Sequence, residues 1–150
     1  MIEITFEPLE PDAITARVKS SSNGAVVTFL GTTRDASDGR NVLHLEYEAY
    51  RPMADKKLAE IAQEVRQRWG IEDVTIAHRL GRLEVGEISL VVAVASPHRK
   101  EAFAACQHAV DRIKQTVPIW KKEYFEGGEV WVESPEDVAA REAAHASSGD

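Results

Sequence analysis

The sequence predicts a single α+β domain in which mixed and antiparallel strands pack with helices. The 150 residues are 43% hydrophobic, which is enough for one compact domain with a buried core. Strand-like and helix-like segments follow one another at irregular intervals, and turn residues such as Gly127-Gly128 join neighbouring strands as hairpins. These two patterns disfavour a doubly wound parallel sheet, and no internal repeat is visible.

The first half of the chain predicts strands separated by two helices. Apolar and polar residues alternate in the strand segments, whereas the helical segments carry apolar residues three and four positions apart. In order, we expect a strand at 2–6, a helix at 11–19 with Pro11 in its first turn, a strand at 25–30 that ends at Gly31, a polar loop at 31–41, a strand at 42–50, and a helix from Pro52 that stops at Gly70.

The second half predicts two strands, a long helix and a hairpin. The strands cover residues 74–79 and 87–95, around a turn region at 81–86. Ser96 as N-cap and Pro97 as first helical residue begin the helix, and Pro118 ends it. Its expected apolar stripe contains Phe103, Cys106, Ala109, Val110, Ile113 and Val117. Strands at 119–125 and 129–133 form the hairpin, so the domain spans residues 1–133, and residues 134–150 are a helix from Ser134 and a polar tail.

Composition argues against several classes of protein. The formal net charge of −7 disfavours a general nucleic-acid-binding surface. The N-terminus lacks a signal-peptide pattern, and the apolar runs are far shorter than the roughly 20 residues of a membrane helix. Cys106 is the single cysteine and falls in the apolar stripe, which favours packing over persulfide chemistry. We therefore expect a cytoplasmic protein without nucleic-acid or membrane partners, and the histidine spacing predicts neither a metal site nor a cofactor.

Two segments are candidates for binding an anion. The helix start Ser96-Pro97-His98-Arg99 offers free backbone N–H groups, the positive end of a helix dipole and two donor side chains, which together suit a phosphate. The segment Gly31-Thr32-Thr33-Arg34 offers close backbone approach at glycine, two hydroxyls and a guanidinium. Taken alone, the first pattern also fits solvated first-turn residues, and the second fits an ordinary polar turn.

Three lysines near the end of the long helix are candidates for acid–base chemistry. Lys114 lies at the border of the apolar stripe, from which it can project into a cleft. Lys121 and Lys122 follow each other in an extended segment, so they point to opposite faces and only one is expected in a shared site. If Lys114 and one of them share a pocket with Arg34 and Arg99, repulsion and burial will lower a lysine pKa. The alternative is that Lys114 only snorkels from the core border.

Five segments, taken in order, resemble the molybdopterin synthase large-subunit family. They are Phe29-Leu30-Gly31-Thr32-Thr33-Arg34, Leu45-Glu46-Tyr47-Glu48-Ala49-Tyr50, His78-Arg79-Leu80-Gly81, Ser96-Pro97-His98-Arg99, and the run from Lys114 to Glu123. The block Val117-Pro118-Ile119-Trp120-Lys121-Lys122-Glu123 is the most specific. The resemblance covers about residues 25–133. One departure is that threonine occupies both positions between Gly31 and Arg34, where the family can place a basic residue.

The resemblance implies a fold, an assembly and a reaction. The fold is an α/β-hammerhead, and the assembly is a central homodimer with one small ubiquitin-like sulfur carrier on each large subunit, a heterotetramer. The reaction transfers sulfur from the carrier's C-terminal thiocarboxylate to cyclic pyranopterin monophosphate, called precursor Z. The product is the dithiolene of molybdopterin, an intermediate of molybdenum cofactor biosynthesis.

The resemblance also implies which residues form the site. Lys114 and Lys121 are expected to be catalytic, with Lys114 near the carrier's terminal carbonyl and Lys121 near the pterin. The expected substrate-binding residues are Thr32, Thr33, Arg34, His98, Arg99, Lys122 and Glu123. Two other functions remain open: a non-catalytic module that binds the C-terminus of a ubiquitin-like protein, and a phosphoester or acyl-transfer hydrolase. The hydrolase has no serine elbow, metal set or paired carboxylates in its favour.

Overall fold

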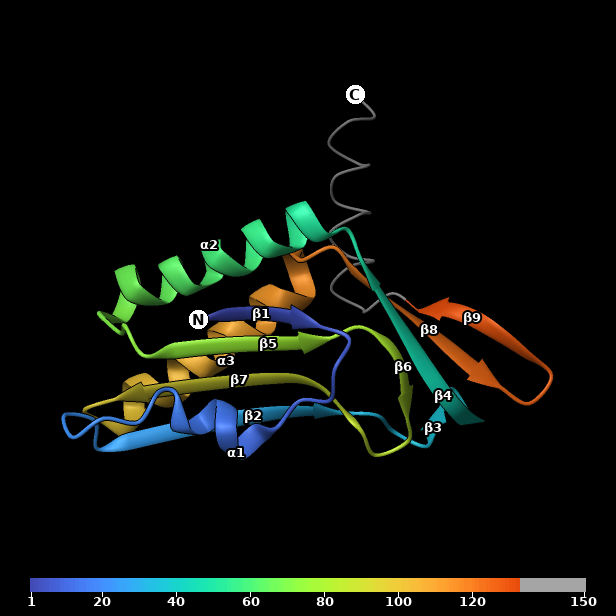
Figure 1. Cartoon of the computed structure of the whole chain (residues 1–150), viewed down its shortest axis with the longest axis horizontal. Helices are drawn as coiled ribbons and strands as arrows, with labels where there is room; N and C mark the ends of the chain where they lie inside the picture. Colours follow the sequence, from blue (N-terminus) through green and yellow to red (C-terminus); the bar gives the residue numbers. More distant parts are fainter. Residues whose placement is uncertain (133–150) are drawn as a thin grey trace, which may run out of the picture.

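The computed structural model describes residues 1–132, which form three α-helices and two β-sheets (Figure 1). The strands are β1 (Ile2–Thr5), β2 (Ala25–Thr32), β3 (Ala36–Ser37), β4 (Arg40–Ala49), β5 (Val74–Arg79), β6 (Gly81–Glu84), β7 (Ile88–Ser96), β8 (Ile119–Phe125) and β9 (Gly128–Val132). The helices are α1 (Pro11–Ala16), α2 (Arg51–Trp69) and α3 (Arg99–Thr116). The predicted helix from Ser134, the polar tail and the expected boundary after residue 133 lie outside the described residues.

The first sheet, in the order β1-β5-β7-β2, forms the centre of the domain. β1 runs parallel to β5, while β7 is antiparallel to both β5 and β2. Helices α2 and α3 cover one face, and α1 covers the other (Figure 1). Residues 90–95 of β7 are therefore buried on both faces: Val92 and Val94 pack with the core under α2 and α3, and Val91 and Ala93 pack with the core under α1.

The second sheet, in the order β3-β4-β8-β9, extends away from the first (Figure 1). All its strand pairs are antiparallel, and β6 also pairs with β4. Leu45 of β4 and Leu83 of β6 lie opposite each other in this pairing, and both are buried. The mixed first sheet and the antiparallel second sheet confirm the predicted α+β class.

Small and branched apolar residues form the buried faces of the two long helices. α2 buries Ala54, Leu58, Ile61 and Val65 on one face and ends at Gly70, whose φ of 67° is the left-handed cap that glycine favours. α3 buries a stripe of three alanines together with Cys106 and Ile113, which lets the helix lie close to β7. The Cys106 thiol lies 3.8 Å from the carbonyl oxygen of Val92, and burial raises its pKa to about 11. Its packing role is therefore confirmed.

The segment at 31–41 is more regular than the predicted loop. β2 continues through Gly31 to Thr32, with a register irregularity between these two residues. Asp38 and Gly39, with φ values of 50° and 76°, form the two-residue turn of a β3–β4 hairpin. Asp-Gly is a strong hairpin signal because both turn residues need positive φ. The polar composition of the segment concealed that signal, so the loop prediction was wrong.

Three further predictions were wrong in detail. Residues 81–84 form β6 rather than a turn, because Leu83 is buried and this short segment pairs with β4. α3 begins at Arg99 with His98 as its N-cap, because Ser96 remains in β7 and its hydroxyl donates to the His98 carbonyl. Phe103 is 61% exposed, since the buried stripe of α3 lies a third of a turn away from it.

Candidate active site

Four of the predicted site residues meet where α3 ends and the second sheet begins. We call Arg34, Lys114, Lys121 and Glu123 the lysine cluster. Lys114 lies in the last turn of α3, Lys121 and Glu123 lie on β8, and Arg34 follows the end of β2. The four are electrostatically coupled, because the charges of the other three all act on Lys121. Three cations face one carboxylate, so the cluster favours an anionic ligand.

Strand β8 places only one of the two adjacent lysines, Lys121 and Lys122, in the lysine cluster. Lys121 pairs with Tyr47 of β4 and lies on the same face of the strand as Glu123, which is 4% exposed. Lys122 lies on the opposite face, where its ammonium is 3.4 Å from a carboxylate oxygen of Glu129 and 5.3 Å from the ring centre of Tyr124. The structure therefore does not bring Lys122 together with the other predicted residues.

Lys121 is the lysine whose protonation the cluster tunes. Burial lowers its pKa, Glu123 opposes this effect, and the positive charges of Lys114 and Arg34 lower the pKa further. This is the effect expected of a lysine that shares a pocket with other cations, although Arg99 takes no part in it. A lysine with a lowered pKa releases and accepts a proton more readily near neutral pH, which suits general acid–base chemistry.

Beside the cluster lie the buried His78 and the partly buried Tyr47, in T-shaped contact at 5.0 Å between ring centres. His78 Nδ1 lies 2.8 Å from the carbonyl oxygen of Arg79, so this nitrogen carries the proton and donates. Burial lowers the pKa of His78 to about 4, and the charge of Lys114 adds to that effect. His78 is therefore neutral at physiological pH.

Tyr47 connects this aromatic pair to β2, which ends at Thr32, two residues before Arg34. Burial raises the pKa of Tyr47, whereas a hydrogen bond with Ser89 opposes the rise. The Ser89 hydroxyl in turn donates to the carbonyl oxygen of Gly31 at 3.2 Å. Sequence reasoning did not include Tyr47 or His78 among the site residues, although both lie in the segments that carry the family resemblance. A histidine at the end of an otherwise apolar strand was the available signal.

Thr33 is held in place mainly through its backbone. Its N–H donates to the carbonyl of Glu87 at 3.0 Å, and its carbonyl accepts from Gly86 at 2.8 Å. Its hydroxyl oxygen is buried and has no hydrogen-bond partner among the described residues. Glu87 is also bound by Arg79, at 2.8 Å. Thr33 thus fixes the start of the loop that carries Arg34, while Thr32 remains exposed.

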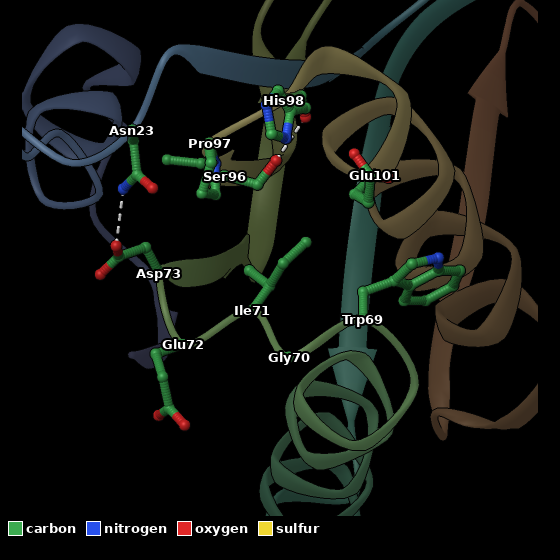
Figure 2. Close-up of a pocket in the computed structure, with 11 residues that line it drawn as sticks. Asn23, Trp69, Gly70, Ile71, Glu72, Asp73, Ser96, Pro97, His98 and Glu101 are labelled. Atoms are coloured by element: carbon green, nitrogen blue, oxygen red, sulfur yellow. Dashed lines mark hydrogen bonds between the residues drawn. The ribbon is translucent and has the colours of Figure 1, made fainter.

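His98 and Arg99 lie at the other end of α3 from the lysine cluster. Lys114 lies fifteen positions after Arg99 along the helix, a rise of roughly 22 Å at 1.5 Å per residue. Both are exposed, and His98 lines the rim of a cavity of about 420 Å³ (Figure 2). Within one chain, the predicted anion-binding helix start and the two lysines predicted to be catalytic are therefore far apart.

Among residues 1–132, no group of three or more histidine, cysteine or carboxylate side chains is arranged to hold a metal ion. In the same part of the chain, no helix is long and apolar enough to cross a membrane.

Comparisons with known proteins agree with the fold. A model of the MoaE protein family matches residues 4–116. The molybdopterin synthase catalytic subunit of Bacillus subtilis is 47% identical over 130 residues, which are 87% of this chain and 83% of the relative. A crystal structure of molybdopterin synthase from Staphylococcus aureus has a TM-score of 0.85 at 43% identity, covering 88% of this chain and 96% of that chain. A complex of subunits 1 and 2 of the molybdopterin-converting factor from Helicobacter pylori is similar in fold, with a TM-score of 0.75 at 20% identity, covering 89% and 91%.

The fold, the cationic site and these relatives define a sulfur-transferring enzyme of molybdopterin biosynthesis. The hammerhead fold implied by the sequence resemblance is confirmed by the structural neighbours. The chain belongs to the MoaE family, whose curated relatives are molybdopterin synthase catalytic subunits.

Proposed function

We propose that this chain moves sulfur from the C-terminal thiocarboxylate of a small ubiquitin-like carrier to cyclic pyranopterin monophosphate, forming the dithiolene of molybdopterin. The observation that carries the proposal is the lysine cluster, in which a partly buried lysine of lowered pKa lies beside Lys114 and Arg34. An anionic substrate and an anionic sulfur donor both suit such a cluster. The relatives' shared name supports the same reaction.

The chemistry requires charge stabilisation and proton transfer rather than a protein nucleophile. For each sulfur, a carbon–sulfur bond forms on the pterin substrate and a carbon–oxygen bond at the same carbon breaks, its oxygen staying on the phosphate or leaving as water. The carrier's acyl–sulfur bond breaks by hydrolysis, so water supplies the oxygen of the carboxylate left on the carrier. The exposed Lys114 is accessible to a chain entering from outside and stabilises negative charge on the carrier's terminal carbonyl. The partly buried Lys121 moves protons near the pterin.

A second copy of the chain completes the site in this proposal. One copy cannot place His98 and Arg99 beside its own lysine cluster, because α3 holds them roughly 22 Å apart. In a homodimer, the helix start of one copy reaches the substrate phosphate held by Thr32, Thr33 and Arg34 of the other. One carrier on each large subunit then gives a heterotetramer, and a cytoplasmic location agrees with Cys106 being a free thiol.

The first test is single-turnover conversion of precursor Z by the purified chain with a thiocarboxylated carrier, with the dithiolene product followed by mass spectrometry. Product that forms only when chain, carrier and precursor are all present supports the sulfur transferase. Carrier binding without product would instead support the non-catalytic module for a protein C-terminus. Release of phosphate or acyl groups from generic esters would point to a hydrolase.

A further inference from the structure

Tyr47 contacts both of the sheets that carry the lysine cluster. Arg34 follows β2 of the first sheet, whereas Lys121 and Glu123 lie on β8 of the second sheet. Tyr47 lies on β4 of the second sheet, directly opposite Lys121, so the two side chains are neighbours on one face. Its ring and its hydroxyl both contact residues of the first sheet. The side chain therefore reaches from the second sheet to the first.

Two contacts hold the side chain of Tyr47 against the first sheet. The ring of His78, on β5, lies in T-shaped contact with the ring of Tyr47 at 5.0 Å between ring centres. The hydroxyl of Tyr47 forms a hydrogen bond with Ser89, on β7. Ser89 is buried, so little water competes for this bond. A ring that is held both at its edge and at its hydroxyl has little freedom to turn.

Ser89 connects Tyr47 to β2 at an irregular point of the ladder. The register of β2 against β7 shifts after Gly31 and leaves Ser89 without a partner in the ladder, so Ser89 is the extra residue of a β-bulge. Its hydroxyl donates its proton to the carbonyl oxygen of Gly31 at 3.2 Å. The Tyr47 hydroxyl is therefore the donor in its bond with Ser89. The two hydrogen bonds run in one direction, from Tyr47 to the strand end that precedes Arg34.

Tyr47 is poorly suited to a direct chemical role. Burial raises its pKa, and the hydrogen bond with Ser89 only partly offsets the rise, so the phenol keeps its proton at neutral pH. That proton is donated to Ser89 and not to a ligand of the lysine cluster. A general base would need to be deprotonated, and a general acid would need its proton directed at the substrate. Any effect of the hydroxyl on the reaction therefore acts through the residues that it holds.

We infer that Tyr47 is a positioning residue that holds Arg34 at a fixed distance from Lys121. It acts through Ser89 and the carbonyl of Gly31, and its effect on sulfur transfer rests on the proposed function. Arg34 and Lys121 are attached to different sheets, so a small shift between the sheets would separate their charges and weaken the repulsion between them. The hydrogen bonds from the phenol to the Gly31 carbonyl oppose such a shift.

The first test removes the hydroxyl alone. Tyr47→Phe keeps the ring and its contact with His78. Carbon-13 NMR of labelled lysine side chains is expected to show a higher pKa for Lys121, because Arg34 is then free to move away from it. The rate of sulfur transfer is expected to fall by roughly three- to tenfold, which is the effect of one hydrogen bond. Ser89→Ala breaks the same connection at its second member and should have the same two effects, even if Tyr47→Phe does not fold.

A combined variant separates positioning from a general structural effect. In an Arg34→Gln background no positive charge remains to be positioned, so Tyr47→Phe should leave the pKa of Lys121 unchanged. The matched control is Tyr124→Phe, because the Tyr124 hydroxyl donates to Glu46 at 2.8 Å on the opposite face of the same two strands. This control is expected to keep the parent's pKa for Lys121 and to transfer sulfur within about twofold of the parent's rate.

Two results would overturn the inference. One is a folded Tyr47→Phe chain that keeps the parent's pKa for Lys121, whatever its rate of sulfur transfer. The other is an equal rise of that pKa in the parent and Arg34→Gln backgrounds, because the hydroxyl would then act on Lys121 by a route that does not involve Arg34. If the parent chain does not convert precursor Z, the proposed function fails, while the NMR measurement still tests the positioning of Arg34.

Discussion

Lys121 and Lys122 are neighbours in the sequence but lie on opposite faces of β8. Lys121 faces the lysine cluster with Glu123, whereas Lys122 contacts Glu129 and the rings of Tyr124 and Trp131. The alternation of a β-strand thus assigns two identical side chains to different surroundings. Substitution of each lysine separates the effect of position from the effect of charge.

The first prediction concerns these two lysines. Lys121→Ala is expected to lower single-turnover sulfur transfer at least tenfold, about 1.4 kcal/mol of barrier. Lys122→Ala removes the same charge from the other face and is expected to stay within about twofold of the parent, because its partly exposed ion pair with Glu129 lies away from the lysine cluster. Equal losses in the two variants, with unchanged thermal unfolding, would contradict the assignment of Lys121.

The second prediction concerns the pKa of Lys121. Lys114 and Arg34 both lower it, so Lys114→Gln or Arg34→Gln removes a nearby positive charge and is expected to raise it. The part of the pH–rate profile that depends on deprotonation of Lys121 should then move to higher pH. Carbon-13 NMR of labelled lysine side chains across a pH titration measures the shift directly. A pKa that stays constant or falls in both variants would show that these cations do not act on Lys121.

The third prediction concerns stability at acid pH. His78 has a pKa of about 4 in the folded chain, below its ordinary value of 6.5. Between these values the unfolded chain binds a proton that the folded chain excludes, so stability falls as pH drops from about 6.5 toward 4. At pH 5 the loss from this group is about 2 kcal/mol. Urea unfolding at pH 7 and pH 5 measures it, and His78→Asn should reduce the difference by that amount.

The fourth prediction concerns Gly24. A Cβ at this position would lie 2.7 Å from the carbonyl oxygen of Pro97, closer than atoms pack. Gly24→Ala is therefore expected to cost about 1–3 kcal/mol of unfolding free energy and to displace the segment that leads into His98. Gly128→Ala is the matched control, because its Cβ would meet only the ring of Phe125 at 3.5 Å. Denaturant unfolding of both variants measures the difference. Equal unfolding midpoints for Gly24→Ala and Gly128→Ala would contradict the prediction.

The fifth prediction concerns Cys106. Its thiol is buried under β7 with a pKa of about 11, so it should not react with thiol reagents until the chain unfolds. Cys106→Ala should keep sulfur transfer within about twofold of the parent, since the donor sulfur belongs to the carrier. Loss of turnover in a folded Cys106→Ala chain would instead support a persulfide mechanism at Cys106.

Local sequence patterns predicted the long elements well. The apolar spacing of α2 and its stop at Gly70 were correct, because both depend on residues close in the chain. The short strands β3 and β6 were missed, since their stability comes from pairing with β4 rather than from their own composition. The exposure of Phe103 was missed because the predicted stripe left out Ala102 and Ala105, which turn the buried face of α3 away from Phe103.

The candidate site was predictable only in part. The family resemblance pointed to Arg34, Lys114 and Lys121, and the structure brings them together. Tyr47 and His78 were not predicted as neighbours of the cluster, because a contact between two strands leaves no spacing signal in the sequence. The length of the predicted helix already implied that His98 and Arg99 lie far from Lys114. Their shared charge and chemistry suggested a single pocket instead.

The helix α3 holds two groups of predicted site residues, one at each of its ends, at a fixed distance from each other. Inserting one residue within it would turn Lys114 by about 100° and advance it by about 1.5 Å relative to Arg99, while pushing Ala105, Ala109 and Ile113 out of the core. Insertions at the Asp38-Gly39 turn or at Gly127 would instead be absorbed by exposed chain. Natural variation in length should therefore accumulate at those two turns and avoid α3, even at its solvent-facing positions.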